Sequence, residues 1–236
     1  MTGNSRPVIS KQTGPHPDLL ARVKRYQQLS FLKPIAAFNQ HAFAQAEQLW
    51  QTQGGPLILD SGCGVGDSTR FLAEAFPDHF VLGLDRSEDR LARKRPPLPD
   101  NAQLIRTDLL DFWRLVAAAH WPVARHYLLY PNPYPKPAQL GYRFHAHPAF
   151  PALMAISGDY FEARSNWSIY LQELQLALDA YGRTSQLVPL AQATNPISAF
   201  EAKYRDSGQT LWQLVSECAL GSTAAPTQPD ALLSCE

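Results

Sequence analysis

Residues 59–66 read LDSGCGVG, and the apolar pair Leu57-Ile58 leads directly into them. Gly62, Gly64 and Gly66 therefore follow a short apolar run. Glycine adopts positive φ and lacks Cβ, so a glycine cluster lets backbone amides approach a ligand closely. An apolar strand before the cluster and a helix after it form a nucleotide-type site at the carboxyl end of the strand. The stretch therefore predicts an α/β fold that binds such a ligand.

Predicted strands and helices alternate along the rest of the chain. The strand-like runs are 56–60, 80–85, 103–108, 124–131 and 159–166, and the helical stretches between or after them are 66–76, 87–95, 109–119 and 167–181. This alternation predicts a doubly wound, mostly parallel sheet with helices on both faces. A last strand at 211–216 is expected to be antiparallel. The stretch 131–151 contains six prolines and is expected to be mostly loop.

The chain divides into three parts. Helical spacing at 17–29 and 34–51 makes residues 1–53 an N-terminal basic, helical segment, which we expect to pack on the core. Residues 54–220 form the α/β domain. Residues 221–236 are small, polar and acidic, and are expected to be a disordered tail.

Composition limits the class of protein. The chain has 236 residues, of which 45% are hydrophobic and 18% charged, as in soluble globular proteins. No apolar run approaches the roughly 20 residues of a membrane span, and the N-terminus lacks the apolar core of a signal peptide. The three cysteines fit neither a disulfide framework nor a zinc spacing. We therefore expect a cytoplasmic protein with no membrane span and no metal.

The net charge is zero, but basic residues gather in two places. Residues 1–36 carry six basic residues against the single acid Asp18, and RLARKR at 90–95 closes a predicted helix. Phosphate contacts need only a local density of cations, so RNA binding is compatible with either cluster. Each cluster is explained equally well as a solvated helix face or as cations that favour a helix C-terminus.

The ligand is indicated by three acidic residues. Asp60, Asp85 and Asp108 end three successive predicted strands, which places three acceptors along one edge of the sheet. Asp85 is placed to accept from the ribose hydroxyls, and Asp108 from an adenine amino group. The glycine spacing is Gly-x-Gly-x-Gly, with Asp67 where dinucleotide-binding folds have their last glycine. An acid-rimmed pocket suits the cationic S-adenosylmethionine better than a pyrophosphate, although the same Asp residues also fit helix N-caps.

Further motifs follow in a fixed order. They are PNPYPK at 131–136, SNWSIY at 165–170, SAFEAKY at 198–204 and, before the glycine loop, PVISKQTGPHPDLLARVKR at 7–25. With the glycine loop, GLDRSEDRLARK and Thr107-Asp108, this set resembles the tRNA (guanine-N7)-methyltransferase family over most of residues 7–215. The family has a class I, Rossmann-like methyltransferase fold and uses S-adenosylmethionine.

The resemblance assigns roles to individual residues. Asn132 is the implied catalytic residue. The implied cofactor-binding residues are Asp60, Gly62, Gly64, Gly66, Asp85, Arg86, Asp108 and Asn132. The implied substrate-binding residues are Lys136, Asn166, Ser198 and Glu201. The implied partner is tRNA, and the sequence does not distinguish a monomer from a homodimer.

Several positions depart from the family pattern or have a structural explanation. Asn132 and Asn166 are amides where the family has carboxylates. The family's basic stretch after the proline motif is PAQLGYRFHAH here, whose basic members are Arg143, His145 and His147. The two histidines are expected to be solvent-exposed. Lys136 also fits a solvated loop lysine, Ser198 and Glu201 also fit an N-cap and its capping-box acid, and Trp167 and Phe150 fit the core.

Two alternative functions follow from these departures. Asn132-Pro133-Tyr134 resembles the Asn-Pro-Pro-Tyr loop of amino-group methyltransferases, which accepts hydrogens from a target amine. The acceptor would then be an exocyclic base amine or a side-chain amide. The other alternative is a catalytically inactive subunit that binds the cofactor or RNA.

Overall fold

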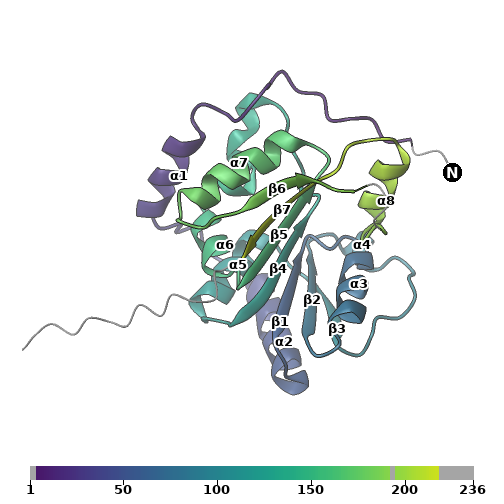
Figure 1. Cartoon of the computed structure of the whole chain (residues 1–236). Coiled ribbons are helices and arrows are strands. Elements are labelled where there is room, and N and C mark those ends of the chain that lie inside the picture. Colours follow the sequence, from purple (N-terminus) through teal and green to yellow (C-terminus); the bar gives the residue numbers. More distant parts are fainter. Residues whose placement is uncertain (1–3, 192–194, 218–236) are drawn as a thin grey trace, which may run out of the picture.

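The computed structural model describes residues 4–191 and 195–217, and its centre is one seven-stranded sheet (Figure 1). The strands are β1 (Leu57–Ser61), β2 (Phe80–Asp85), β3 (Ala102–Arg106), β4 (Val123–Leu129), β5 (Tyr160–Ser165), β6 (Gln186–Pro189) and β7 (Trp212–Glu217). Their order is β3-β2-β1-β4-β5-β7-β6. The first five pair in parallel, whereas β7 runs antiparallel to both β5 and β6, as predicted for the last strand.

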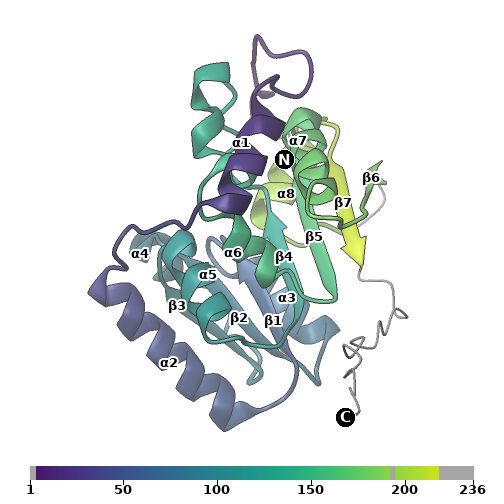
Figure 2. The same ribbon diagram turned by 90° about the vertical axis from the view of Figure 1, so that its left-hand side faces the viewer.

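Helices cover both faces of this sheet (Figure 2). They are α1 (Leu19–Gln28), α2 (Ala37–Gln53), α3 (Asp67–Ala75), α4 (Glu88–Leu91), α5 (Leu109–Ala118), α6 (Phe150–Ala155), α7 (Ser168–Asp179) and α8 (Ala199–Asp206), with 3₁₀ turns η1 (Pro137–Tyr142) and η2 (Phe144–Ala146). In Figure 2 the helices α2, α5, α6 and α1 lie on the near face and α3 lies behind the sheet. The chain thus forms the three-layer α/β arrangement that the strand–helix alternation predicts.

The two faces of the sheet carry two apolar clusters. Trp113, Phe112 and Leu128 belong to the larger one, and Ile58 and Leu72 to the smaller one. Burial of such side chains stabilises the fold by about 1.5–3 kcal/mol each. Trp167 and Phe150 belong to the larger cluster, as predicted.

The N-terminal helices are part of this packing. Leu19 and Val23 of α1 and Ala46 of α2 are each at most 1% exposed and join the larger cluster. Among the described residues, no helix is both long enough and apolar enough to cross a bilayer. Residues 221–236, predicted to be disordered, lie outside the described part of the chain.

One local prediction was wrong, and two elements were not predicted. The helix expected at 87–95 is the single turn α4, because like-charged residues at 93–95 and Pro96 disfavour its continuation. The proline-rich stretch consists of loop and the 3₁₀ turns η1 and η2 up to its end, where the unpredicted helix α6 starts at Phe150 with Pro151 in its first turn, a position that tolerates proline. The short edge strand β6 was not predicted.

Candidate active site

A cavity of about 610 Å³ opens at the carboxyl ends of β1, β2 and β4. Five of the residues predicted to bind the cofactor line it: Gly62, Asp85, Arg86, Asp108 and Asn132. Strands β2 and β3 lie on one side of β1, and β4 and β5 lie on the other, so the strand order reverses between β1 and β4. Open α/β sheets bind ligands at such a point. The sequence prediction of a site at this edge therefore agrees with the geometry.

The glycine loop is tied to the end of β2. Gly64 has a φ of 63°, and its N–H donates to Asp85 Oδ2 at 3.0 Å. Gly66 has a φ of 85° and precedes α3, and a Cβ there would lie 2.9 Å from Leu104 Cδ1. The positive φ favours glycine at both positions, and the close approach to Leu104 adds to this preference at Gly66.

Asp60 lies beneath the glycine loop and is fully buried. Its Oδ2 accepts from Ser68 Oγ at 2.6 Å and Thr69 Oγ1 at 2.7 Å, both in the first turn of α3. Its Oδ1 is buried without a hydrogen-bond partner among the described residues. Burial raises the pKa of Asp60 to about 6, although the two hydroxyl hydrogen bonds lower it. The carboxylate is thus held in place with one oxygen unused.

Asp85 is the best-connected acid of the cavity. Its Oδ1 accepts from the Ser87 N–H at 2.8 Å and forms an ion pair with Arg90 Nη2 at 3.0 Å. With Gly64 on the other oxygen, the carboxylate is fixed in one orientation. Arg86, predicted to belong to the cofactor site, also lines the cavity.

Asp108 lies at the cavity and also caps a helix. It lines the cavity, and its Oδ1 accepts from the Leu110 N–H at 2.9 Å as the N-cap of α5. Its own N–H donates to Oδ1 of Asn39, which also accepts from Thr107 Oγ1. Asn39, anchored by Asp111, is a positioning residue that no sequence motif marked.

The floor of the cavity holds a polar chain that sequence reasoning missed. Trp113 Nε1 donates to Ser61 Oγ at 3.0 Å, and Ser61 Oγ lies 2.8 Å from His126 Nε2. Burial lowers the pKa of His126 to about 3, so the imidazole is neutral at physiological pH. Ser61 can therefore donate its hydroxyl hydrogen to His126 while accepting from Trp113.

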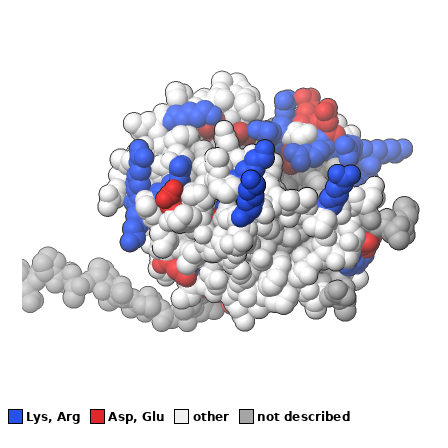
Figure 3. Space-filling view, turned by 90° about the horizontal axis from the view of Figure 1, so that it is seen from above, with Lys and Arg blue, Asp and Glu red and all other residues white. Residues whose placement is uncertain are grey.

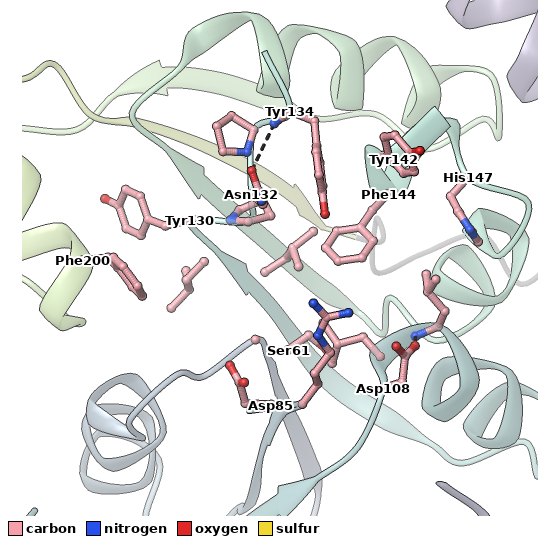
Figure 4. Close-up of a pocket in the computed structure, with 18 of the residues that line it drawn as sticks. Ser61, Asp85, Asp108, Tyr130, Asn132, Tyr134, Tyr142, Phe144, His147 and Phe200 are labelled. Atoms are coloured by element: carbon pink, nitrogen blue, oxygen red, sulfur yellow. Dashed lines mark hydrogen bonds between the residues drawn. The ribbon is translucent and has the colours of Figure 1, made fainter. Parts of the chain in front are cut away.

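The opposite wall of the cavity is formed by the acceptor loop, residues 130–136, and by aromatic rings. Asn132 Oδ1 accepts from the Tyr134 N–H at 3.3 Å. Figure 4 shows Tyr130 and Phe200 on one side of Asn132 and Tyr134, Tyr142 and Phe144 on the other. We call these five rings and Tyr204 the aromatic rim. The Tyr134 and Tyr142 centroids lie 5.4 Å apart, and Tyr142 is 65% exposed at the mouth.

The four residues predicted to bind substrate do not line the cavity. Lys136 is exposed, and Asn166 Nδ2 donates to Gln209 Oε1 at 2.9 Å. Ser198 caps α8 by accepting from the Glu201 N–H, which confirms the N-cap interpretation. The Glu201 carboxylate is 2% exposed and pairs with Arg164 at 2.9 and 3.0 Å. A substrate role for these four residues stays a prediction.

The expected exposure of the two loop histidines needs correction. His145 is 1% exposed, and its Nε2 lies 2.9 Å from Glu173 Oε2. His147 is partly buried and lines the cavity. Arg143, counted with them as a basic loop residue, is fully buried against Glu173. The turns η1 and η2 bring this segment against α7, whose Glu173 compensates the buried charge.

The residues of the cavity fit S-adenosylmethionine. Asp85 ends β2 at the position where a ribose diol requires an acceptor, and Asp108 lies on the same wall (Figure 4). Gly62 and Gly64 leave the backbone open, since a Cβ on either would meet no atom closer than 3.7 Å. The unpaired oxygen of Asp60 adds negative charge beneath the loop, which suits a ligand with a sulfonium and an ammonium group.

Comparison with known proteins agrees with this geometry. Residues 58–124 match the family model described as a methyltransferase domain. The chain has a class I methyltransferase fold. A solved structure titled an antibiotic-related methyltransferase superposes with a TM-score of 0.53 at 14% identity, covering 75% of this chain and 94% of that one. A 16S rRNA (adenine(1408)-N(1))-methyltransferase variant with cosubstrate SAM from Catenulisporales acidiphilia has a TM-score of 0.52 at 19% identity, covering 78% and 93%.

The curated relatives cover less of the chain. The trans-aconitate 2-methyltransferase of Acidovorax sp. (strain JS42) is 43% identical over 60 residues, 25% of this chain and 23% of the relative. The tRNA (guanine-N(7)-)-methyltransferase of Treponema pallidum (strain Nichols) is 27% identical over 168 residues, 67% of this chain and 66% of the relative. The chain thus spans about a quarter of the first relative's length and about two thirds of the second's.

These matches confirm the predicted Rossmann-like methyltransferase fold and S-adenosylmethionine as its cofactor. They support a methyltransferase and do not agree on one acceptor, because the relatives named above act on trans-aconitate, tRNA and rRNA.

Proposed function

We propose that this chain transfers a methyl group from S-adenosylmethionine to a nucleobase in RNA, with N7 of a guanine in tRNA as the acceptor. The observation that carries the proposal is the position of Asn132 within the aromatic rim, on the wall opposite Asp85 and Asp108 (Figure 4). Flat rings around a polar side chain suit a flat acceptor that carries hydrogen-bonding groups on its edge.

The charges of the cavity argue against a small carboxylate acceptor. Among the described lining residues, the only basic side chains are Arg86, Arg90 and His147, and Arg90 is paired with Asp85. A polycarboxylate would require several cations near the acceptor position. The rim contains tyrosine and phenylalanine there instead. A trans-aconitate-like substrate therefore fits this cavity poorly.

Methylation of guanine N7 makes modest demands on the protein. The N7 atom already has an exposed lone pair, so no general base has to remove a proton. S-adenosylmethionine, when bound, supplies an electrophilic methyl carbon on a sulfonium. What remains for the residues is to align the acceptor and to exclude water. Asn132 can donate from its Nδ2 to the base edge while Oδ1 stays on Tyr134, and the rim rings can stack on the base faces.

Exposed cations are available for the RNA backbone. Figure 3 shows Lys and Arg side chains at several places on the face seen from above, with acidic groups beside some of them. Arg6, Lys11, Arg93 and Lys94 are exposed. Fully buried Arg143 cannot reach a phosphate, so RNA contacts depend on the exposed residues.

A second candidate is methylation of an exocyclic base amine. The carbonyl oxygen of Asn132 accepts one hydrogen bond, from Tyr134, and retains a second lone pair. That lone pair can accept from an amine, as the Asn-Pro-Tyr sequence suggests. An inactive RNA-binding subunit stays the third possibility.

The experiment that tests the proposal is incubation of the purified chain with methyl-labelled S-adenosylmethionine and, in separate reactions, bulk tRNA, rRNA or trans-aconitate, followed by mass spectrometry of the nucleosides or of the small acid. We expect 7-methylguanosine. Label on an exocyclic amine would favour the second candidate. Label in trans-aconitate but not in RNA would overturn the proposal. Cofactor binding without transfer to tRNA or rRNA would favour the inactive subunit.

A further inference from the structure

The guanidinium of Arg143 makes a complete set of internal hydrogen bonds. Nε and Nη2 donate to the carbonyl oxygen of Tyr134 at 3.2 and 3.0 Å. Nη1 donates to both carboxylate oxygens of Glu173 at 2.7 and 2.5 Å, and Nη2 also donates to Gln12 Oε1 at 3.0 Å. These five bonds equal the five N–H groups that arginine possesses. The guanidinium carbon lies 4.9 Å from the centre of the Trp167 ring.

The segment that Arg143 holds has an unfavourable backbone conformation. Tyr130 and Tyr134 have φ values of 52° and 44°, and among the described residues His120 is the only other non-glycine residue with a positive φ. Both tyrosines flank Asn132. A bulky residue in this region is unfavourable and persists only where surrounding contacts hold it. For Tyr134 the described contacts include the two bonds from Arg143 and the Asn132 Oδ1 that accepts its N–H.

We propose that Arg143 is a positioning residue for methyl transfer: through the Tyr134 peptide it fixes the conformation of the acceptor loop and the direction of the Asn132 amide. The inference rests on the proposed function, in which the acceptor loop receives the substrate. It gives Arg143 a different role from the phosphate contact that its place in a basic loop suggests.

Glu173 makes this arrangement possible. It is fully buried on α7 and accepts from Arg143, from His145 and from the N-terminal arm, residues 5–16. In the arm, Gln12 Nε2 and the His16 N–H donate to Glu173 Oε1 at 2.6 and 2.9 Å. An arginine buried without such a carboxylate would be strongly destabilising. The Glu173 carboxylate therefore allows the charged guanidinium of Arg143 to be buried against the acceptor loop.

The N-terminal arm closes the outer side of the same cluster. Ser10 Oγ donates to the Pro135 carbonyl oxygen at 2.5 Å, within the acceptor loop. Gln12 bridges Arg143 and Glu173. The arm and Arg143 thus contact neighbouring carbonyls of one loop, from residues 134 and 135. The arm assists the positioning that Arg143 performs.

The geometry requires arginine rather than any cation. The fork reaches Tyr134, Glu173 and Gln12 at once, in three directions. A lysine ammonium is a point charge on a flexible stem and cannot reproduce the planar fork. Arg143→Lys should therefore keep the compensated charge and lose part of the loop contact.

The test uses the full chain with the paired substitution Arg143→Met and Glu173→Gln. Removing both charges avoids an unpaired buried ion, and the amide oxygen of Gln still accepts from the N-terminal arm. The matched control is Arg183→Met, which removes an arginine that also binds backbone carbonyls, those of Gly158 and Ser216, away from the acceptor loop. Arg143→Lys tests partial rescue.

We expect the paired variant to exchange the Tyr134 amide hydrogen at least tenfold faster by NMR, with unchanged exchange in β1 and β4. Its affinity for S-adenosylhomocysteine should change less than twofold. On the RNA substrate, kcat should fall at least tenfold with a smaller change in KM. The exchange rate and kcat of Arg143→Lys should lie between those of wild type and the paired variant. Arg183→Met should match wild type in both.

The exchange measurement needs no activity, so it separates this inference from the proposed function. Unchanged Tyr134 exchange in the paired variant would overturn the positioning role, whatever the substrate. A parallel loss of melting temperature, cofactor affinity and kcat would also overturn it, because a general structural role predicts that pattern. Faster exchange in the paired variant of a chain whose wild type methylates no RNA would contradict the proposed function alone.

Discussion

Arg90 Nη2 lies 3.0 Å from Asp85 Oδ1, on the carboxylate that is expected to bind the ribose of the cofactor. The other oxygen of Asp85 accepts from the Gly64 N–H. The Arg90 side chain is 39% exposed, whereas that of Asp85 is 4% exposed, so the arginine can withdraw into solvent and the acid cannot. Cofactor binding would then replace Arg90 by the ribose hydroxyls as a partner of Asp85, and the hydrogen bond from Gly64 would stay in place.

Asp85→Ala should weaken binding of S-adenosylmethionine or S-adenosylhomocysteine at least tenfold, about 1.4 kcal/mol. The substitution removes a charged acceptor for two hydroxyls and frees the Gly64 amide. Isothermal titration calorimetry measures this directly. The control is Arg90→Gln, which removes only the displaceable partner and should change the affinity less than threefold. Binding of NAD and none of S-adenosylmethionine to the wild-type chain would contradict the assignment.

Cofactor affinity should fall as pH decreases through about 6. Burial raises the pKa of Asp60 to about 6, although Ser68 and Thr69 lower it, so its negative charge is present above this pH and is lost below it. The cationic groups of the cofactor stay charged throughout this range. Loss of this uncompensated charge between pH 7 and pH 5 should weaken the affinity for the cofactor roughly tenfold, about 1.4 kcal/mol.

Calorimetric titrations at several pH values test this dependence, with Asp60→Asn as the control. The amide keeps an oxygen for Ser68 and Thr69 but carries no charge. Its affinity should be low and nearly independent of pH. A wild-type affinity that is flat between pH 5 and pH 7 would exclude Asp60 as an electrostatic contributor.

Basic residues of the N-terminal arm should contribute to RNA binding. Arg6 and Lys11 are exposed, and Ser10, next to Lys11 in the chain, contacts the acceptor loop. Replacing both with Gln should weaken tRNA binding and reduce the slope of log K against log salt by about 1–2, because two phosphate contacts are lost. Filter binding at several salt concentrations measures the slope, and cofactor affinity should stay unchanged.

The matched control removes two basic charges from α1 and none from the arm. It carries Lys24→Gln and Arg25→Gln, both at exposed positions. We expect a smaller loss of affinity. Substitutions are preferable to deletion of residues 1–36, because Leu19 and Val23 belong to the core. Identical slopes for wild type and the arm variant would show that these cations are merely solvated.

The fold was accessible from sequence because its signals are local. Strands β1 and β2 are short apolar runs, strands alternate with helical stretches, and Gly62 to Gly66 mark the first turn without any distant partner. The end of α4 was misjudged because charge repulsion and Pro96 outweighed helical spacing. The short strand β6 depends on pairing with β7, which no local pattern encodes.

Much of the site was not accessible in the same way. Asp85 and Asp108 were found because one ends β2 and the other lies two residues after β3. Asn39 meets Asp108 across 69 positions of the chain, and Arg143 meets Glu173 across 30. An interpretation that uses only neighbouring residues in the sequence therefore places Arg143 and His145 in a basic loop. Only the packing of η1 and η2 on α7 shows that both are buried.

Asn132→Asp distinguishes the two enzyme candidates. If guanine N7 is the acceptor, the aspartate places a negative charge near the developing cation, and activity should hold or rise. A favourable charge in a partly dry site can lower the barrier by about 1–3 kcal/mol. The carboxylate also keeps an acceptor for the Tyr134 N–H, so the acceptor loop should retain its conformation. If an exocyclic amine is the acceptor, the added charge disturbs the carbonyl acceptors and activity should fall steeply.

The measurement is the initial rate of methyl transfer to tRNA by wild type, Asn132→Asp and Asn132→Ala at one pH, with the product nucleoside identified. Asn132→Ala is the control, and it should lose most activity with either acceptor because the loop loses its internal acceptor for Tyr134. A large loss in Asn132→Asp together with a methylated exocyclic amine would exclude guanine N7. No transfer by any of the three, with cofactor binding intact, would instead indicate the inactive RNA-binding subunit.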